Sequence, residues 1–484
     1  MLTEITPMIA FASENAPVAL HWFRNDLRLR DNPALTEAAR FGAVVPVWID
    51  DTTIPPNEAP GAAYRWWTRR SLVALDDALK GNLRFFRGDP SVLLPDLVRR
   101  YGVRRVTWTE AHEPCVRARD TLLATSLTEL GVEVVRRNGS LLWNPETIAK
   151  PDGTPYRVFT PFFQKGCLAA PSPRTPLPAP DLTLIPRAAS EPGVEPAPEA
   201  EWERKLGTQW TIGEAAAHTR LDAFLANGLA GYASGRDFPA RPHTSRLSPY
   251  LAHGEISPNT LWYAVAGRAS ARDVAKFRTE LAWREFAHYL LVHFPQMVTE
   301  PFRPEFTAFP WEEDEALCRR WQRGETGIPI VDAAMRALWR TGYLHNRLRM
   351  VVASFLTKNL LLHWRVGEAW FRDTLVDYTL ASNVASWQWV AGCGADAAPY
   401  FRIFNPVLQA EKFDPDGSFI ATYLPELAKL PTPARFAPWT ASEATREAAG
   451  LFLGKNYPQP IVSLVASRAR ALAAYARIKA STSD

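Results

Sequence analysis

Residues 18–50 read VALHWFRNDLRLRDNPALTEAARFGAVVPVWID, and this stretch decides the architecture of the first part of the chain. Two apolar, β-rich runs, at 18–23 and 43–50, flank a segment with helical periodicity. Further runs of the same kind follow at 83–88, 104–110 and 132–137. Alternation of strand and helix predicts a doubly wound parallel sheet, and nearly continuous apolar strands indicate that both of its faces are covered. We therefore expect a five-stranded α/β domain over residues 17–140.

The turn after the first apolar run carries no glycine-rich dinucleotide fingerprint. Its sequence, RNDLRLRDNPAL at residues 24–35, contains no G-x-G-x-x-G. That motif brings a backbone close to a pyrophosphate at the start of a helix. Any dinucleotide is therefore expected outside this sheet.

The rest of the chain changes character twice. Residues 171–203 are too rich in proline for a packed element, and they predict a linker laid over a surface, which we place at residues 141–207. The pattern from residue 208 to 478 is helical, without a strand signal or a fixed repeat. We expect an all-α domain there, with short tails at residues 1–16 and 479–484.

Composition narrows the class of protein only a little. The net charge of +4 permits a nucleic-acid partner, but it fits an ordinary slightly basic enzyme as well. The four cysteines are scattered, without the close spacing of a zinc or thiol-redox pair. There is no convincing signal peptide and no apolar span of membrane length. We expect a soluble, cytoplasmic protein with no membrane partner.

Three short segments combine residue types that suit a ligand. Thr244, Ser245 and Ser248 stand with Arg246 just before a predicted helix, where hydroxyls and free amides can bind a phosphate. Ordinary helix capping explains the same residues. In a second segment, Glu280 and Arg284 are spaced for a surface ion pair, and Trp283 lies on nearly the same face as Glu280. That face suits a pocket or simple core packing.

The third segment is GYLHNRLRM at residues 342–350. Asn346, Arg347, Arg349 and Met350 give one helix both polar and soft side chains, which is unusual for a core helix and favours a ligand or nucleic-acid contact. His345 receives no role, because a histidine in such a position more often packs.

Residues 377–406, DYTLASNVASWQWVAGCGADAAPYFRIFNP, combine tryptophans with small side chains. Asn383 and Trp387 are four residues apart and share a helical face, whereas Trp389 points elsewhere. An amide and an indole on one face suit a flat heteroaromatic ring. Trp364 and Trp311 lie upstream, and tryptophans in a helical domain usually belong to the core.

With these motifs in view, the chain resembles the DNA photolyase/cryptochrome family over nearly its whole length. The resemblance is carried by RDFPARPHTSRLS, LAWREF, GIPIVDAAMR, GYLHNRLRM and WQWVAGCGADAAPYFRIFNP. It implies an α/β domain, a wrapping linker and an all-helical domain that holds FAD in a U-shaped conformation.

The resemblance also assigns the cofactor site. Tyr232 and the segment Thr244, Ser245, Arg246, Leu247 and Ser248 match the cradle of the adenosine and diphosphate. The residues around the isoalloxazine and ribityl chain match Arg284, Asn346, Arg349, Asp377, Thr379 and Asn383. Asn383 would face the flavin N5, and Arg349 and Asp377 would form a buried ion pair beside the ring. Many relatives carry an acid in place of Thr379, so that contact is expected to be weaker or made by backbone.

Two further sets follow from the resemblance. Trp387, Trp364 and Trp311 match the family's tryptophan chain, which passes electrons from the surface to the excited flavin. The pocket for a flipped-out pyrimidine dimer matches Glu280, Trp283, Asn346, Met350 and Trp389. Arg236, Arg284 and Arg347 would contact phosphates or bases around its mouth.

Within the family, Asn383 and the segment LHNRLRM favour repair of cyclobutane pyrimidine dimers, with UV-damaged DNA as the partner of a monomeric enzyme. A blue-light photoreceptor without repair activity and a (6-4) photolyase are the alternatives, and the short C-terminus disfavours the first. The family also implies a second, antenna chromophore. EAHEPCVRARD is compatible with a folate such as methenyltetrahydrofolate, and a deazaflavin is the other option.

Overall fold

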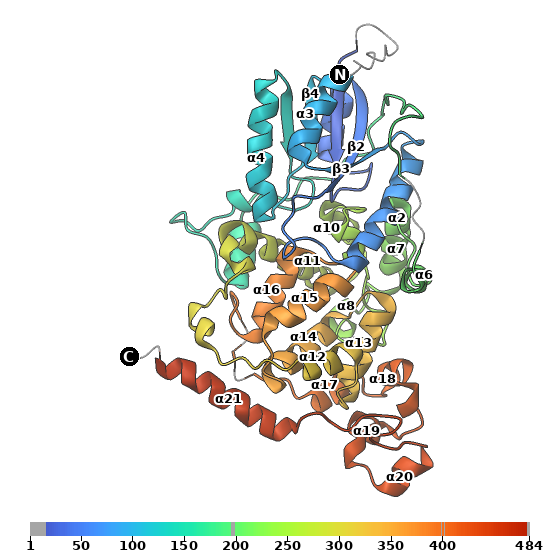
Figure 1. The fold of residues 1–484 in the computed structure, drawn as a ribbon, viewed down its shortest axis with the longest axis vertical. Helices are drawn as coiled ribbons and strands as arrows, with labels where there is room; N and C mark the ends of the chain where they lie inside the picture. Colours follow the sequence, from blue (N-terminus) through green and yellow to red (C-terminus); the bar gives the residue numbers. More distant parts are fainter. Residues whose placement is uncertain (1–15, 195–198, 398, 401, 482–484) are drawn as a thin grey trace, which may run out of the picture.

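A computed structural model describes residues 16–194, 199–397, 399–400 and 402–481. In it an α/β domain stands on a larger helical domain (Figure 1). The predicted tail at 1–16 lies outside the described residues except for its last residue. The sheet is the predicted five-stranded parallel one, in the order β3-β2-β1-β4-β5. Its strands are β1 (Val18–Phe23), β2 (Ala43–Asp51), β3 (Arg84–Gly88), β4 (Arg105–Thr109) and β5 (Glu133–Arg137).

Alternate residues of the central strand face two separate cores. Leu20 and Trp22 of β1 pack in one core, with α3 (Pro90–Tyr101) and α4 (Pro114–Glu129). Ala19 and Phe23 point the other way, into a core with α1 (Pro33–Phe41) and α2 (Ala62–Ala78). Successive side chains on a strand point to opposite faces, so helices cover the sheet on both sides.

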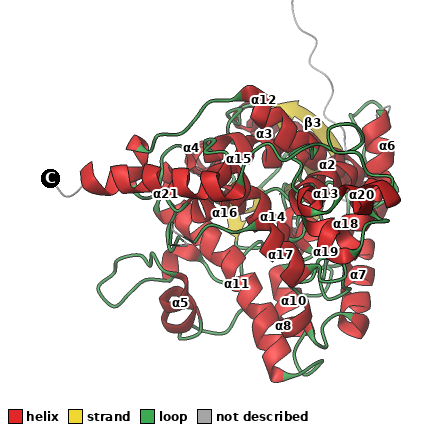
Figure 2. Cartoon of the chain, turned by 90° about the horizontal axis from the view of Figure 1, so that it is seen from below, coloured by secondary structure: helices red, strands yellow, loops and turns green. Residues whose placement is uncertain are grey.

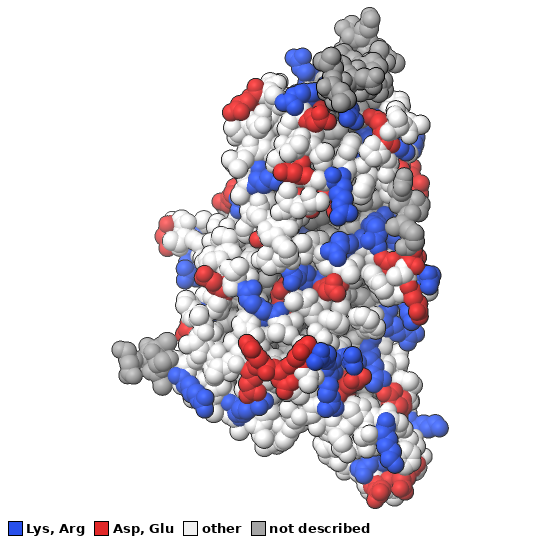
Figure 3. Space-filling model, viewed as in Figure 1, with Lys and Arg blue, Asp and Glu red and all other residues white. Residues whose placement is uncertain are grey.

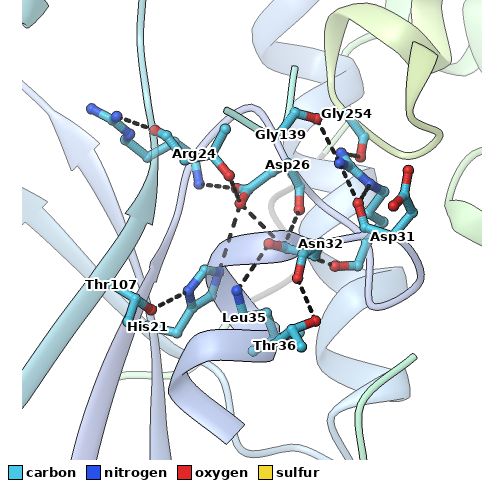
Figure 4. Close-up of polar contacts among 12 residues, drawn as sticks. His21, Arg24, Asp26, Asp31, Asn32, Leu35, Thr36, Thr107, Gly139 and Gly254 are labelled. Carbon is cyan, nitrogen blue, oxygen red and sulfur yellow. Dashed lines mark hydrogen bonds and ion pairs between the residues drawn. The ribbon is translucent and has the colours of Figure 1, made fainter. Parts of the chain in front are cut away.

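The turn after β1, which lacks the glycine fingerprint, holds a buried polar network (Figure 4). Asp26 lies beside His21 and accepts hydrogen bonds from the backbone nitrogen of Arg24 and from the hydroxyl of Thr109. Burial alone would raise the pKa of Asp26, but these contacts keep it far below its usual range. Arg28 donates to the carbonyl oxygens of Gly139 (2.7 Å) and Gly254 (2.8 Å). One guanidinium therefore joins the turn after β1 to the end of the α/β domain and to the helical domain.

The linker is more structured than its sequence predicts. It contains η1 (Pro145–Thr147), α5 (Phe159–Pro161), the π-helix η2 (Phe162–Cys167) and α6 (Glu201–Gly207). Phe159, Phe162 and Phe163 are buried in the core of the helical domain. The surface position was predicted from the proline-rich residues 171–203 and not from this part, because a short aromatic segment can pack well without a long periodic pattern. The proline-rich part does follow the surface, with one bridge from Leu184 to Val44.

The remaining elements are helical, as predicted. The α-helices are α7 (Glu214–Asn227), α8 (Tyr232–Gly235), α9 (Ser248–Ala252), α10 (Pro258–Ala264), α11 (Ala271–His293), α12 (Glu315–Arg323), α13 (Pro329–Thr341), α14 (Asn346–Ser354), α15 (Trp364–Thr374), α16 (Leu380–Ala391), α17 (Pro406–Phe413), α18 (Ser418–Tyr423), α19 (Thr432–Phe436), α20 (Glu443–Ala448) and α21 (Leu464–Ser481). The 3-10 helices are η3 (Pro295–Val298), η4 (Pro304–Ala308), η6 (Pro425–Leu427) and η7 (Pro438–Thr440), and η5 (Phe355–Asn359) is a π-helix.

The last helix, α21, runs along the edge of the helical domain (Figure 2). It ends at Ser481, within the segment 479–484 that the sequence predicts as a tail, and residues 482–484 lie outside the described part. No helix in the described ranges is long and apolar enough to cross a membrane. Basic and acidic side chains are interspersed over the face in Figure 3, so that face carries no single-sign field.

Candidate flavin and lesion site

A cavity of about 520 Å³ opens inside the helical domain. Three helices give it most of its predicted polar and aromatic lining. The helix α11 contributes Glu280, Trp283 and Arg284; α14 contributes Asn346, Arg349 and Met350; and the segment leading into and along α16 contributes Asp377, Thr379, Asn383, Trp387 and Trp389. Arg236 and Ser248 complete the predicted set. Residues from three distant motifs of the sequence therefore meet at one hollow.

The helix α14, which lines this cavity, begins after a histidine that caps its N-terminus. His345 is the N-cap: its Nδ1 accepts a hydrogen bond from the backbone nitrogen of Arg347 (3.2 Å). Its Nε2 lies 2.8 Å from the carbonyl oxygen of Arg236, and burial lowers its pKa to about 4. The neutral imidazole therefore ties α14 to the segment at Arg236. Sequence analysis gave His345 no role, and its contribution is this cap.

An ion pair lies on the cavity wall, where the resemblance placed it. Nη2 of Arg349 lies 2.9 and 2.7 Å from the two carboxylate oxygens of Asp377, whose side chain is 3% exposed. Nε of Arg349 donates to the carbonyl oxygen of Leu344, and the hydroxyl of Ser248 donates to Asp377 at 2.6 Å. A buried charge pair costs least when further hydrogen bonds satisfy both partners, as they do here.

Asn383 is held by a residue that sequence analysis missed. Its Nδ2 donates to both the backbone oxygen (3.0 Å) and Oε1 (2.8 Å) of Glu368. Two acceptors on Glu368 direct the amide nitrogen toward α15, so Oδ1 is left as an acceptor for a group in the cavity. Burial raises the pKa of Glu368. The two residues lie on separate helices fifteen positions apart, and no sequence pattern links them.

Of the three predicted tryptophans, Trp387 lines the cavity, and Trp364 and Trp311 lie outside its lining. The indole of Trp387 lies against α15 at Gly367, where an added Cβ would be 2.0 Å from it, and only a glycine allows that approach. Trp364 is one turn earlier on α15. The ring of His363 lies 5.6 Å from that of Trp364 and 5.2 Å from that of Trp311. Trp387 and Trp364 are buried, whereas Trp311 is partly exposed.

Glu280 is paired differently from the expectation. It does not bond the residue four positions later; its carboxylate bonds the guanidinium of Arg236 and lies 2.9 Å from Nζ of Lys276, one turn earlier on α11. The expected pair with Arg284 was wrong because tertiary packing of α8 brings Arg236 closer. Both charge partners of Glu280 therefore lie at the cavity.

Two of the three arginines expected at the mouth have other neighbours. Arg284 lines the cavity, but its Nη1 donates to the carbonyl oxygen of Ser140 and lies 3.3 Å from Glu285. Arg347 does not line the cavity; it pairs with Asp237 at 3.1 Å and lies over the ring of Phe413. Of the three, Arg236 is the one whose guanidinium meets a cavity carboxylate.

The segment predicted as a phosphate cradle forms a loop into α9. Ser248 begins that helix and lines the cavity, whereas Thr244, Ser245, Arg246 and Leu247 are outside the lining. Arg246 has a left-handed backbone (φ +53°), and its guanidinium lies over the rings of Trp210 and Tyr343.

Two other predicted cofactor contacts have local structural partners. Tyr232 packs its ring against those of Phe224 and Phe277 and does not line the cavity. Thr379 is the N-cap of α16, where its hydroxyl accepts a hydrogen bond from the nitrogen of Ser382 (3.3 Å). A threonine in the place of an acid thus keeps the start of the helix intact.

The cavity has the polar edges that a flavin requires. Nε1 of Trp387 is buried without a hydrogen-bond partner among the described residues, and Asn383 presents an acceptor. The guanidinium of Arg349 supplies positive charge at the same cavity. An apolar hollow with a few convergent polar groups is the usual form of a cofactor site. The residues present therefore fit an isoalloxazine ring.

A second, smaller cavity of about 230 Å³ lies in the α/β domain, beyond the carboxyl ends of β2 and β3. Thr53, Asp89, Ser91, Cys115 and Arg119 are among its lining residues. Ligands of doubly wound sheets bind outside the carboxyl ends of the strands. This cavity overlaps the predicted antenna segment, which runs through Cys115 and Arg119.

Comparisons with known proteins agree with this geometry. Residues 19–181 match the family model of DNA photolyase, and residues 277–477 match that of the FAD binding domain of DNA photolyase. The deoxyribodipyrimidine photo-lyase of Agrobacterium fabrum is 44% identical over 489 residues, covering 97% of this chain and 99% of the relative. Cryptochrome-1 of Arabidopsis thaliana is 35% identical over 468 residues, covering 93% of this chain and 69% of that protein.

A solved structure extends the match to the whole fold. The bacterial class III photolyase from Agrobacterium tumefaciens superposes with a TM-score of 0.91 at 44% identity, covering 98% of this chain and 100% of that one. The fold and the cavity define a two-domain flavoprotein whose helical domain binds FAD. The chain belongs to the DNA photolyase/cryptochrome family.

Proposed function

We propose that the protein repairs cyclobutane pyrimidine dimers in UV-damaged DNA, using light. The observation that carries this function is the meeting of Glu280, Trp283, Asn346, Met350 and Trp389 with the flavin residues at one cavity. The relatives named photo-lyase, matched over almost the full length of this chain, support repair over signalling.

The chain's own residues provide binding, orientation and charge. Arg349 and Asp377 would hold the flavin edge, and Oδ1 of Asn383 would accept from it. When bound, reduced FAD supplies light-driven transfer of one electron to the dimer and recovers it after the cyclobutane ring opens, so the reaction is redox-neutral. Trp387, Trp364 and Trp311 would carry electrons inward to keep the cofactor reduced.

The lesion would enter the cavity as a flipped-out dinucleotide. The reacting bonds are inaccessible inside a duplex, and a damaged step is less costly to unstack. Trp283 and Trp389 offer aromatic surface to the bases, and Asn346 and Glu280 offer hydrogen bonds to their edges. Arg236 and Lys276, whose charges lie beside Glu280, would also attract the phosphates at the lesion.

The direct test is repair of a single dimer. A photoreduced sample would be mixed with an oligothymidine that contains one cyclobutane dimer, illuminated with blue light, and compared with a dark control for recovery of thymine absorbance. Light-dependent recovery supports the proposal. No recovery from a sample that contains photoreducible FAD would overturn it, and the same assay on a (6-4) lesion would then test the nearest alternative.

Glu280→Gln tests the lesion role of the carboxylate. The substitution keeps the shape but removes the charge opposite Arg236, and we expect the repair yield per photon to fall about two- to tenfold, the equivalent of one weakened hydrogen bond. Glu411→Gln, on an exposed turn of α17, is the matched control. Equal yields in the two variants would remove Glu280 from the mechanism.

Three accompanying assignments belong to the same proposal. The 230 Å³ cavity at Cys115 and Arg119 is the candidate antenna site for a folate or deazaflavin, which the absorption spectrum of the purified protein would identify. We also propose that the protein acts as a monomer, to be measured by light scattering. We also propose a cytoplasmic location.

A further inference from the structure

The linker and the residue just before it contact α11 at three consecutive residues of that helix, Trp283, Arg284 and Glu285. The ring of Phe159 stacks on Trp283; the carbonyl oxygen of Ser140 accepts from Arg284; and Glu285 accepts from the backbone nitrogen of Leu142 at 2.8 Å. Two of these α11 residues, Trp283 and Arg284, also line the cavity, together with Glu280 of the same helix. The linker therefore forms the backing of one cavity wall.

The contact between Phe159 and Trp283 is closer than any other aromatic pair in the described part of the chain. The ring centroids lie 3.7 Å apart, and the planes are within 8° of parallel. Phe159 is 7% exposed and touches Phe163 and Phe286 on its other sides. An indole has two faces, and the ring of Phe159 stacks on one of them. The partly exposed remainder of Trp283 belongs to the cavity.

Asp396 fixes the position of Phe159. Its Oδ2 accepts a hydrogen bond from the backbone nitrogen of Phe159 at 3.0 Å. Asp396 lies in the small-residue loop after α16 and has a left-handed backbone (φ +48°), which is uncommon for a residue with a side chain. Residues 237 positions apart thus join the linker to the loop that follows Trp387 and Trp389.

We propose that Phe159, anchored by Asp396, is a positioning residue for the DNA lesion: it holds the indole of Trp283 flat so that its free face can stack on a flipped-out base. This inference rests on the proposed repair function. Stacking of a base on an aromatic ring depends on a fixed, parallel orientation. Without the ring of Phe159 behind it, Trp283 could rotate about its side-chain bonds. The lesion would still meet the indole, but the indole would no longer be held in the orientation that stacking requires.

Three variants isolate this role. Phe159→Leu keeps an apolar side chain but removes the flat face, and Phe159→Tyr restores the ring. Phe163→Leu is the matched control, because Phe163 stacks on Phe159 in the same segment and has no ring contact with Trp283 among the described residues. Each protein would be purified with FAD, and its flavin content and thermal midpoint would be recorded first.

The readout is lesion affinity measured in the dark, set against repair at saturating lesion. We expect Phe159→Leu to weaken binding of a dimer-containing oligonucleotide about five- to tenfold, while affinity for undamaged DNA and the yield per bound lesion stay unchanged. Phe159→Tyr should restore the affinity, and Phe163→Leu should retain it. Asp396→Asn, which tolerates the left-handed backbone and keeps an acceptor, should show a smaller loss than Asp396→Ala.

The proposal is overturned if Phe159→Leu binds the lesion as tightly as the unmodified protein, or if Phe163→Leu loses as much affinity. Failure of Phe159→Tyr to restore binding would also overturn it, since then the ring is not what matters. If the unmodified protein itself neither binds nor repairs the dimer, the proposed function fails instead. The two failures are therefore distinct.

Discussion

Asp377 accepts from Arg349 and Ser248 while almost fully buried, so its negative charge is the counter-charge for the guanidinium at the cavity. Asp377→Asn removes that charge and leaves the cation without its partner. We expect FAD to be held more weakly by about 2 kcal/mol, a loss of roughly 30-fold in affinity. Flavin fluorescence released on dilution measures this loss.

The control for Asp377→Asn is Ser248→Ala, which removes one hydrogen bond and leaves the ion pair. It should cost about 1 kcal/mol. An Asp377→Asn protein that retains FAD as well as Ser248→Ala would show that the ion pair does not hold the cofactor.

Trp387 belongs to the cavity wall and to the predicted electron chain, and the two roles can be separated. In Trp387→Phe we expect photoreduction of the bound flavin to be lost, because phenylalanine is much harder to oxidise, while a chemically reduced sample still repairs DNA. Trp321→Phe is the control, since Trp321 is a buried neighbour of Trp387 with ring centroids 6.2 Å apart and is not in the chain. Absorbance during blue illumination separates the outcomes; unchanged photoreduction in Trp387→Phe would contradict the assignment.

For single residues, the sequence predicted well which side chains share a face of a helix, and it predicted poorly which side chains on other helices they contact. Asn383 and Trp387 are brought to one cavity, as their four-residue spacing indicated. Glu368, which orients Asn383, and Arg236, which pairs with Glu280, come from other helices. Helical periodicity says which way a residue points, but partners across helices depend on packing that no local pattern encodes.

Helix α2 is attached to the helical domain through a buried acid. Glu255 accepts hydrogen bonds from Nε1 of Trp67 (3.1 Å), from the hydroxyl of Ser71 and from the backbone nitrogen of Gly213 (2.8 Å). Burial raises the pKa of Glu255 to about 7, from an ordinary value of 4.5. The folded protein therefore binds a proton that the unfolded chain releases between these two values.

The sign of the pH dependence follows directly. The folded-state pKa is the higher one, so this contribution to stability is present below pH 4.5 and is lost as the pH rises toward 7. Glu255→Gln lacks this titrating group. We therefore expect the free energy of unfolding of the variant, relative to that of the unmodified protein, to be higher at pH 8 than at pH 5 by up to roughly 3 kcal/mol. Thermal midpoints from pH 5 to 8 measure the slope, with Glu443→Gln, at an exposed position, as control. A slope unchanged by Glu255→Gln would contradict the raised pKa.

Whole elements were predictable to the extent that they are long and periodic. The five strands follow from apolar runs separated by helical stretches, and α11 follows from 23 residues of unbroken pattern. The buried segment Phe159–Cys167 did not, because its helical part is short, contains Pro161 and continues as a π-helix. Its stability comes from aromatic packing against α11, which is a tertiary effect.

The two domains are joined at the turn after β1 by Arg28. A lysine cannot donate to the oxygens of Asp31, Gly139 and Gly254 at once, since it lacks the planar fork of donors. We expect Arg28→Lys to lower the stability by about 2–4 kcal/mol, through buried carbonyl groups left without donors. Arg30→Lys, two residues away and exposed, should change it by less than about 0.5 kcal/mol.

Calorimetry distinguishes a weakened joint from a merely destabilised domain. If Arg28 unites the domains, the unfolding of Arg28→Lys should broaden or split into two transitions. A variant that melts like Arg30→Lys would show that the joint does not depend on this guanidinium.

The path of residues 140–163 limits where the gene can be divided. A fragment that begins at residue 208 would contain every lining residue of the large cavity, yet it would leave the outer side of α11 bare where Phe159, Phe162 and Tyr156 now cover it. Such a product should aggregate on expression, because a contiguous apolar surface would meet water. A fragment that begins near residue 138 keeps that cover, so a truncated form of this photolyase would have to inherit the linker along with the helices.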